Sequence, residues 1–418
     1  MAIAISRSLE PLPEQARALL ELLLLGNLLP FWETRAIDVR DGGYCLNHDA
    51  RGRCRAPAEK SLVAQTRTLW FFSRIARSAY GREVHLRAAR HGYDFLIRHM
   101  WDDAYGGFYW RTSSSGQVAV ASGKHLYGQA FALCALAEYA IASGLREPGD
   151  LAEELFLTLE RHAWDEAYGG YREFFARDWS LPPDHCGYLG HSPAVKSMNT
   201  HLHVLEALTR YASISSNAVA RKRLAELCAI ISAKVVHHDR RLGAFGIERH
   251  ARDWTPLCEP QDRRTSYGHD VETAWMLLDA YTILGKSATA GLGIAKALFE
   301  HALRFGFDPV GGGFFESGYF GVPADRRAKV WWVQAEGMLG GLRMYIATAD
   351  AKYARCFLRT LSWIATHQAD WEHGEWHPLI DEHGAASGNK AGPWKAPYHG
   401  VRAVLECLER VGTQARVS

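Results

Sequence analysis

The chain has 418 residues, of which 48% are hydrophobic and 22% are charged, so a large packed core is expected and a disordered chain is excluded. Its 48 Lys and Arg residues nearly balance its 46 Asp and Glu residues, which gives a net charge of +2. So small a net charge speaks against a partner that is nucleic acid or an anionic membrane surface.

The first apolar stretch of the chain is too short to cross a membrane. Leu19–Leu29 is interrupted by Glu21 and Asn27 and falls below the roughly 20 apolar residues that a membrane-spanning helix needs. The apolar run Met1–Ile5 is also too brief for a signal peptide, because Arg7 follows it closely. We therefore expect a cytoplasmic protein without a membrane span.

A turn of two glycines and an aromatic residue, usually just after an acidic residue, recurs along the chain. Its six copies are Asp41–Tyr44, Asp102–Phe108, Asp165–Tyr171, Asp239–Phe245, Asp308–Phe314 and Asp370–Trp376. The second glycine is replaced by Ala244 in the fourth copy and by Glu375 in the sixth. The aromatic residues of successive copies lie 62 to 74 residues apart, which leaves room for two helices. Glycine suits the positive φ of a tight turn, and the acid can accept hydrogen bonds from the local backbone.

Two kinds of helix alternate between these turns. The first kind is apolar over most of its circumference and ends at a tyrosine: Tyr80, Tyr139, Tyr211, Tyr281 or Tyr345. The second kind is charged and amphipathic, and it is expected at Arg82–Met100, Asp150–His162, Ala218–His237 and Ser287–Arg304. The apolar helices should be buried on several sides, and the amphipathic helices should cover them.

Six such helix pairs bury their apolar faces by closing into a ring. The sequence therefore predicts an all-α fold, an (α/α)6 barrel of six inner and six outer helices, with residues 1–418 as one domain. An open solenoid of helix pairs is the alternative, but its terminal repeats should be polar. The last repeat here, Trp394–Leu408, is aromatic and apolar, which favours the closed ring.

Residues that are unusual in a core lie at the starts of the expected inner helices. They are Arg67 and Trp70; Lys124, His125, Tyr127 and Gln129; Asn199, His201 and His203; His269, Asp270 and Glu272; Trp331, Trp332, Gln334 and Glu336; and Trp394, Lys395, Tyr398 and His399. Equivalent ends of the inner helices face one end of a barrel, so these residues should converge on one site. A single buried histidine is usually structural, but its recurrence at successive helix starts indicates a function.

The histidines of this set point to acid–base chemistry. His201 and His203 lie about 200° apart on a helix, so only one of them should face the site while the other packs. His269 and Glu272 share a helix face, so Glu272 is expected to support His269 as a general base, a pairing that also fits a simple rim ion pair. Because no zinc-type Cys/His motif is present, we predict no catalytic metal.

Tryptophans next to these polar groups favour a sugar ligand. Aromatic faces stack on the C–H faces of sugars, while Asn, Glu, Arg and His bind the hydroxyls. We assign Trp332 and Trp394 to the site and most of the fourteen tryptophans to packing.

The eight cysteines form no C-x-x-C pair, and Cys134, Cys228, Cys356 and Cys407 lie in apolar helical patterns. They are interpreted as free thiols rather than disulfides or zinc ligands. Phosphate-binding loops and the G-x-S-x-G nucleophile elbow are absent from the sequence, so nucleotide binding and serine hydrolase chemistry have little support.

Five segments, in order along essentially the full chain, resemble the N-acylglucosamine 2-epimerase superfamily and most closely its cellobiose 2-epimerase branch. They are Lys124–Phe131 (KHLYGQAF), Ser197–Glu206 (SMNTHLHVLE), Gly268–Trp275 (GHDVETAW), Val330–Glu336 (VWWVQAE) and Trp394–His399 (WKAPYH). The resemblance implies an (α/α)6 barrel. It also implies reversible inversion at C2 of a reducing-end glucose or mannose unit, as in cellobiose, through a cis-enediolate and without a cofactor.

The resemblance further implies a role for each matching residue. His269 and His399 would move the C2 proton on opposite faces of the sugar, and His203 would assist ring opening. Arg67 would stabilise the enediolate oxygen, where negative charge develops. The remaining residues would bind hydroxyls, support the histidines or stack on sugar rings: Tyr127, Asn199, Glu272, Trp332, Glu336 and Trp394.

Two positions depart from the branch, because Ala396 and Gly400 stand where Cys and Asn are usual. Because of these two departures, the substrate can be either a disaccharide or a monosaccharide. A mannose 2-epimerase and a mannose–fructose isomerase are therefore alternatives on the same scaffold. A glycoside hydrolase is a less favoured alternative, because it would need two carboxylates flanking a glycosidic bond. A helical-repeat binding protein would not need converging histidines. A monomer or a homodimer is expected.

Overall fold

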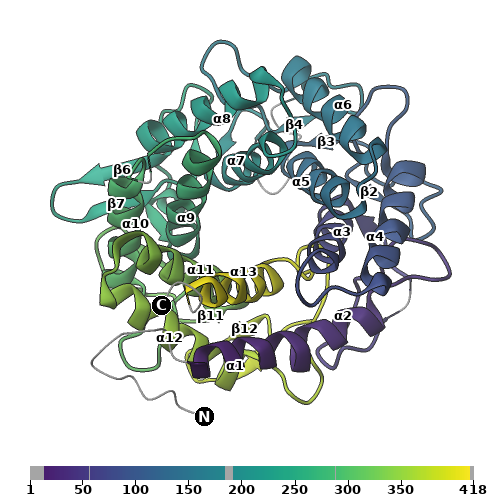
Figure 1. Cartoon of the computed structure of the whole chain (residues 1–418). Coiled ribbons are helices and arrows are strands. Elements are labelled where there is room, and N and C mark those ends of the chain that lie inside the picture. Colours follow the sequence, from purple (N-terminus) through teal and green to yellow (C-terminus); the bar gives the residue numbers. More distant parts are fainter. Residues whose placement is uncertain (1–13, 56, 184–191, 288, 415–418) are drawn as a thin grey trace.

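The structure, a computed structural model, describes residues 14–55, 57–183, 192–287 and 289–414. The chain is mostly helical, as predicted, and Figure 1 shows its helices in two concentric rings. The helices around the centre are α3 (Leu62–Ala76), α5 (Leu126–Ser143), α7 (Met198–Ala212), α9 (Tyr267–Ile283), α11 (Trp331–Thr348) and α13 (His399–Gln414). No helix within the described ranges is long and apolar enough to cross a membrane.

The outer ring covers these central helices. It consists of α1 (Glu14–Leu23) continued by η1 (Leu24–Leu28) and α2 (Leu29–Arg35), α4 (Glu83–Phe95) with η2 (Leu96–Met100), α6 (Glu147–His162), α8 (Ala218–Ile230) with η3 (Ile231–Val235), α10 (Leu292–Phe305), and α12 (Ala351–Trp363) with η5 (Ile364–Gln368). Every residue of α5 from Leu126 to Tyr139 is buried, whereas α6 buries one face around Leu155 and Leu159. The predicted division into buried and amphipathic helices is therefore confirmed.

Helix boundaries differ from the predicted ones where local backbone preferences decide them. α6 begins at Glu147 rather than Asp150, since Pro148 favours the first turn of a helix. α10 begins at Leu292, because Gly291 before it adopts a left-handed conformation with φ of 74°. α3 ends at Ala76, so Tyr80 lies beyond the helix that it was predicted to end.

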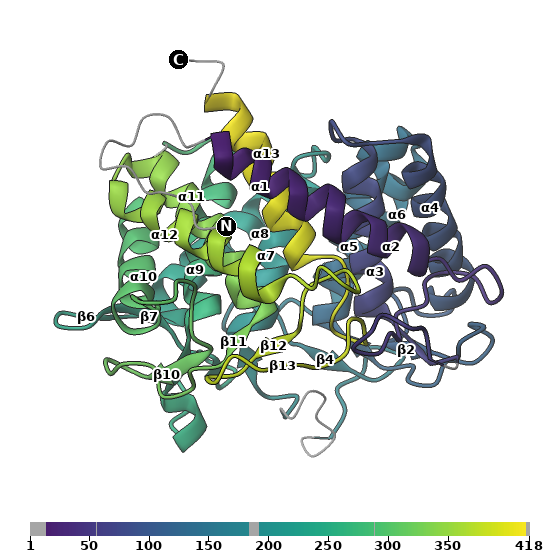
Figure 2. The same ribbon diagram turned by 90° about the horizontal axis from the view of Figure 1, so that it is seen from below.

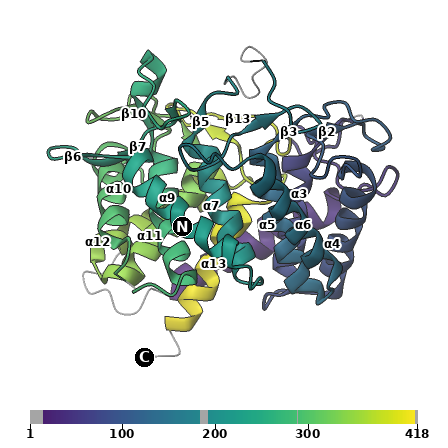
Figure 3. The ribbon, with the colours of Figure 1, turned by 90° about the horizontal axis from the view of Figure 1, so that it is seen from above.

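Short antiparallel strands, which the all-α prediction did not include, lie at one end of the rings (Figures 2 and 3). The pairs are β1 (Lys60–Ser61) with β2 (Arg111–Thr112), β3 (Lys124–His125) with β4 (Phe174–Phe175), β5 (Lys196–Ser197) with β8 (Arg249–His250), β6 (Val236–Asp239) with β7 (Gly243–Gly246), β9 (Arg264–Ser266) with β10 (Ser317–Tyr319), and β11 (Lys329–Val330) with β12 (Leu379–Ile380), which also pairs with β13 (Ala386–Ser387). Strands of two to four residues are too short to show an alternating pattern. Strands β1, β3, β5, β9 and β11 each lead directly into a central helix and so fix where that helix begins.

Several of the Gly-Gly turns are anchored by a glutamine in the first turn of the central helix that follows. The Gln65 side chain accepts a hydrogen bond from the Tyr44 backbone N–H (2.9 Å) and donates one to the Tyr44 carbonyl (2.8 Å). Gln129 forms the same pair with Phe108, and Gln334 with Phe314. The side chains of Gln129 and Gln334 are thus structural, although both belong to the set that was expected to converge on a site.

Buried lysines anchor the same turns through the acidic residue. Lys124 Nζ contacts Asp102 Oδ2 at 2.9 Å, and both side chains are fully buried. Burial alone would raise the pKa of Asp102, but Arg177 and Lys124 hold it well below its usual range. In the first Gly-Gly turn the acid that plays this part is Asp38, which Lys60 Nζ contacts at 2.9 Å, and not the predicted Asp41. Asp38 is the equivalent residue because its carbonyl accepts the Gly42 N–H.

The first and last repeats meet at a seam. Figure 1 shows α1 and α2 alongside α12 and α13, and Asn27 in η1 donates a hydrogen bond to the Asp370 carbonyl (2.8 Å). Arg74 of α3 forms an ion pair with Glu409 of α13. The first and last repeats are therefore held together by polar contacts.

Candidate active site

Most of the predicted site residues lie in the first two turns of neighbouring central helices, whereas Trp394 lies just before α13, and several of them contact one another. Arg67 of α3 donates a hydrogen bond from Nη2 to Tyr127 Oη of α5 (2.8 Å) and one from Nη1 to the Trp394 carbonyl. The ring centroids of Tyr127 and His203 are 5.1 Å apart, and those of His203 and His399 are 6.5 Å apart. The structure thus brings together residues that are far apart in the sequence.

Trp332 of α11 lies between two of the predicted catalytic histidines. Its ring centroid is 4.9 Å from that of His269 on α9 and 5.9 Å from that of His399 on α13. Asn199 is half-buried one helical turn before His203, so the two share a face of α7. These neighbours place an indole and an amide beside the imidazoles.

Each of the three histidines is held by a carboxylate at Nδ1. His269 bonds Glu248 (2.6 Å), His399 bonds Glu336 (2.6 Å), and His203 bonds Glu206 (3.1 Å). A carboxylate can only accept, so it fixes a proton on Nδ1 and leaves Nε2 to act. No other described residue forms a hydrogen bond with the Nε2 atoms, so these nitrogens are the ones available to a substrate.

The pKa values of these histidines are shifted in opposite directions. Burial lowers the pKa of His399 well below its usual range, and the guanidinium groups of Arg67 and Arg402 add to that shift. Burial acts on His269 as well, but the charge and hydrogen bond of Glu248 outweigh it and raise the pKa to about 9. Burial also lowers the pKa of His203, against the effect of Glu206. At neutral pH the site therefore combines a protonated His269 with a neutral His399.

A buried arginine at the start of α13 organises the carboxylates beneath the histidines. Arg402 is 1% exposed, and its guanidinium contacts Glu206, Glu272 (3.1 Å) and Glu336 (2.6 Å) from three different helices. Glu336 also accepts a hydrogen bond from Trp275 Nε1 (3.1 Å). Both oxygens of Glu336 therefore take part in hydrogen bonds, while burial raises its pKa to about 8 against the opposing charge of Arg402.

Glu272 supports His269 as predicted through its charge, which helps to raise the pKa of His269, but it does not form the hydrogen bond to the imidazole. The hydrogen-bond partner of His269 is Glu248, which precedes it by 21 residues in the segment between β7 and β8, while Glu272 turns toward Arg402. Donor atoms of Glu272, Glu336 and His399 lie within 4.8 Å of one another, a spacing that suits a metal ion. The positive charge of Arg402 already occupies this position beside the two carboxylates.

Other members of the expected set are structural. His201 is fully buried, accepts the Tyr171 N–H at Nε2 (3.1 Å) and donates from Nδ1 to the Ser197 carbonyl (2.8 Å). Only one histidine of the His201 and His203 pair therefore belongs to the site, as predicted. Lys395 is paired with Glu375 at 2.6 Å, and Asp270 accepts the Gly246 N–H at 2.7 Å.

Trp394 marks the edge of the site. It is 40% exposed, and its ring centroid lies 5.8 Å from that of Tyr127 and 5.9 Å from that of Trp110. Its backbone carbonyl holds Arg67 while its indole remains accessible. The arrangement provides an aromatic surface beside the residues that are predicted to be catalytic.

Three residues of the site did not stand out in the sequence: Glu206, Glu248 and Arg402. Arg402 follows His399 by three residues, so the two side chains share a face of the helix. This spacing could have identified Arg402 as a neighbour of His399. Glu206 holds the same relation to His203. Glu248 carries no such signal, because it lies outside a helix.

Comparison with known proteins places the chain among sugar-converting enzymes. The profile of the family described as N-acylglucosamine 2-epimerase (GlcNAc 2-epimerase) matches residues 42–403. The cellobiose 2-epimerase of Bacteroides fragilis is 29% identical over 388 residues, which cover 92% of this chain and 96% of that protein. The D-mannose isomerase of Marinomonas mediterranea is 26% identical over 385 residues, 88% of this chain and 91% of that protein.

A solved structure agrees with these relatives. The cellobiose 2-epimerase from Bacillus thermoamylovorans has a TM-score of 0.87 and 30% sequence identity, and the match covers 95% of this chain and 100% of that chain. Since the family profile spans most of its length, the chain belongs to the N-acylglucosamine 2-epimerase family of carbohydrate isomerases and epimerases.

Proposed function

We propose that this protein is a sugar 2-epimerase that inverts C2 of a reducing-end aldose, with a β-1,4-linked disaccharide of the cellobiose type as its substrate. The observation that carries the proposal is the set of three imidazoles, each held at Nδ1 by a carboxylate and each with a free Nε2. Proton removal and return at one carbon need two such groups, one for each face of the sugar.

The protonation states assign a direction to the reaction. Neutral His399 accepts the C2 proton at Nε2, which leaves a cis-enediolate, and protonated His269 returns a proton to C2 from the opposite face. After one turnover His399 is protonated and His269 is neutral, which is the arrangement that the reverse reaction requires. Glu336 and Glu248 stabilise whichever imidazolium forms.

Ring opening and charge stabilisation fall to the neighbouring residues. His203 is placed to exchange a proton with the ring oxygen or O1, since its Nδ1 is held by Glu206. The Arg67 guanidinium, fixed by Tyr127 and by the Trp394 carbonyl, stabilises the enediolate oxygen. Asn199 and Tyr127 bind hydroxyls, while the Trp332 indole covers the sugar between the two catalytic histidines.

The disaccharide preference rests on Trp394. A half-exposed indole next to Tyr127 and Trp110 offers a stacking surface for a second ring beyond the reacting one. The similarity to a D-mannose isomerase favours one alternative, in which the enediolate is protonated at C1 and mannose becomes fructose.

We also propose that the two helical rings form the (α/α)6 barrel of six inner and six outer helices, acting as one catalytic domain. The alternation of buried and amphipathic helices and the contacts across the seam support it. The proposed epimerisation uses no cofactor, and a monomer contains every residue that the mechanism names.

Proton NMR in deuterated water tests the proposal directly. The purified protein is incubated with cellobiose, and separately with mannose, without added metal. We expect deuterium at C2 and a 4-O-linked mannose product from cellobiose. Glucose from mannose alone would assign a monosaccharide epimerase, fructose would assign an isomerase, and free glucose without C2 exchange would indicate a hydrolase.

Variants of the two histidines distinguish a loss of catalysis from a loss of folding. His269→Ala and His399→Ala should each lose about 10²- to 10⁴-fold in epimerisation while keeping the far-ultraviolet circular dichroism of the parent. His383→Ala is the control, since this histidine is 83% exposed and lies outside the site. Full turnover by either catalytic variant would remove that histidine from the mechanism.

A further inference from the structure

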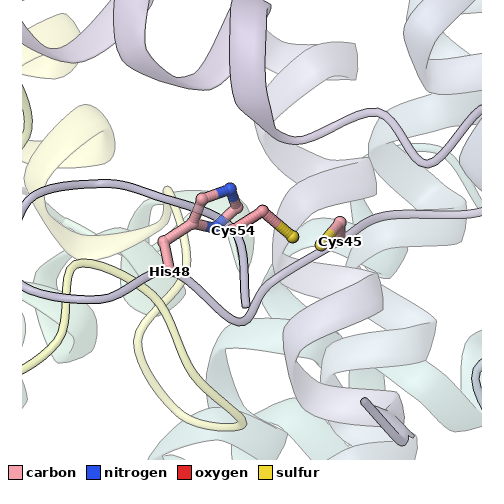
Figure 4. A group of neighbouring side chains, drawn as sticks. All are labelled: Cys45, His48 and Cys54. Carbon is pink, nitrogen blue, oxygen red and sulfur yellow. The ribbon is translucent and has the colours of Figure 1, made fainter. Parts of the chain in front are cut away.

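A loop near the N-terminal end of the chain gathers two thiols and an imidazole outside the active site. Cys45, His48 and Cys54 offer donor atoms that all lie within 4.8 Å of one another. Figure 4 shows the Cys54 thiol beside the His48 ring, with Cys45 across from it on the neighbouring stretch of the loop. An antiparallel bridge between His48 and Cys54 brings the two ends of the loop together.

The loop is rigidly built around this cluster. Asp49 Oδ1 accepts the N–H groups of Arg51 (2.9 Å) and Arg53 (3.0 Å), and its other oxygen pairs with the Arg53 guanidinium at 2.9 Å. Gly52 takes a φ of 71° at the tip, where a Cβ would lie 2.7 Å from the Phe31 ring. The backbone therefore holds the three side chains in place before any ligand arrives.

His48 is a buried imidazole whose two ring nitrogens are poorly satisfied by the residues that the structure describes. It is 1% exposed, and neither of its ring nitrogens has a hydrogen-bond partner of good geometry among the described residues. The Arg35 carbonyl lies near the ring but does not meet that geometry. Since buried polar groups are nearly always satisfied, the imidazole points to a ligand that it binds.

We propose that Cys45, His48 and Cys54 bind a Zn²⁺ ion. Two thiolates and one imidazole are the donors that zinc prefers, and they disfavour Mg²⁺ and Ca²⁺, which take oxygen ligands. Binding breaks the two S–H bonds and releases both protons to solvent, so the thiolates carry the ligating charge. Cys54 is exposed, which leaves room for a water molecule as the fourth ligand. This proposal departs from the prediction that the cysteines are only free thiols.

The position of the cluster gives the ion a structural role. The His48 carbonyl accepts the Ala391 N–H and the Asp49 carbonyl accepts the Lys390 N–H, both at 3.3 Å. The segment that contains Lys390 and Ala391 leads to Trp394 at the edge of the active site. A bound ion would hold the loop of the first repeat in place where it contacts the last repeat, and so stabilise the contacts across the seam.

Metal binding is tested on the reduced full-length protein after treatment with a chelator. Zn²⁺ is added, the excess is removed by desalting, and the retained metal is measured by mass spectrometry. We expect one ion per chain, and a rise in Tm of about 3 °C at saturating Zn²⁺. Co²⁺ in place of Zn²⁺ should give thiolate-to-metal charge-transfer absorption in the near ultraviolet.

Matched variants decide whether the three residues hold the ion. Cys45→Ser and Cys54→Ser should each retain at least tenfold less Zn²⁺ and lose the cobalt absorption, with unchanged circular dichroism. Cys258→Ser removes another exposed free thiol and should bind as the parent does. No retained metal in the parent, equal retention by the Cys45 and Cys54 variants, or a Cys45–Cys54 disulfide in place of free thiols would each overturn the proposal.

Discussion

The hydrogen bond between Glu248 and His269 sets the acid side of the proposed reaction. Glu248 raises the pKa of His269 to about 9 against the effect of burial, so that the imidazole is protonated at neutral pH. In Glu248→Gln that charge is lost and burial dominates, so His269 should lose its proton at a lower pH. We expect the alkaline limb of the kcat profile to move to lower pH, with about 10- to 100-fold less activity at pH 8.

The pH–rate profile of cellobiose epimerisation measures this change. Glu382→Gln is the control, because Glu382 is 60% exposed and its ion-pair partner is the exposed His383 rather than a histidine of the proposed site. An unaltered alkaline limb in Glu248→Gln would show that Glu248 does not control the protonation of His269.

Trp394 should distinguish a two-ring substrate from a one-ring substrate. Its exposed indole is proposed to stack on the second sugar, a contact worth about 1 kcal/mol. Trp394→Ala should therefore raise KM for cellobiose about fivefold and leave KM for mannose nearly unchanged, as measured by initial rates. Equal effects on both sugars would assign Trp394 to the support of Arg67 instead.

Arg402 is the residue on which the carboxylates beneath the histidines depend. Arg402→Met would leave Glu206, Glu272 and Glu336 buried without their common cation, which should lower the free energy of unfolding by about 3–5 kcal/mol. Urea unfolding measures the loss. Arg326→Met, which removes a 59% exposed partner of Glu316, should change stability by less than about 0.5 kcal/mol. Similar values for the two variants would contradict the central role of Arg402.

At the level of elements, the Gly-Gly turns pack against the first turn of a central helix, as Phe108 does against Gln129 of α5. Gly107 has a φ of 70°, and a Cβ there would lie 2.6 Å from the Trp179 ring and 3.2 Å from Gln129 Oε1. Gly144, after α5, has a φ of 68° but no heavy atom within 4 Å of such a Cβ. The two glycines therefore share a backbone conformation and differ in packing.

Alanine at each position separates these two effects. Gly144→Ala should cost about 1 kcal/mol for the left-handed conformation alone. Gly107→Ala should cost about 1–3 kcal/mol more, because Trp179 and Gln129 must also move. Equilibrium unfolding in urea gives both values, and equal costs would show that the turn tolerates a side chain.

The sequence predicted the helices because they depend on local periodicity, and the same periodicity predicted which side chains of one helix share a face. The different orientations of His201 and His203 follow from their angle on one helix, and the structure confirms them, because His201 bonds Tyr171 while His203 bonds Glu206. The pairing of His269 with Glu248 was not predictable, because a non-helical segment 21 residues away supplies the carboxylate. The short strands were not predicted for a similar reason, since most of their pairings depend on contacts between segments that are far apart in the sequence.

Across the whole molecule, the seam between the first and last repeats decides whether the rings behave as one unit. The proposed site takes Arg67 from the first repeat and His399 from the last, so catalysis requires the seam to be closed. Asn27, 1% exposed, crosses it with a hydrogen bond to the Asp370 carbonyl. A closed ring has no free end from which to unfold, whereas an open array of repeats frays from its ends.

Asn27→Ala tests this difference. Loss of the buried hydrogen bond should lower the free energy of unfolding by about 1–3 kcal/mol. In a closed ring, circular dichroism, tryptophan fluorescence and epimerase activity should still be lost together in one transition. Asn217→Ala is the control, since it removes the N-cap of α8 away from the seam at a cost of about 1 kcal/mol. Loss of activity before the helices unfold, in Asn27→Ala but not in Asn217→Ala, would instead indicate an array that opens at its ends.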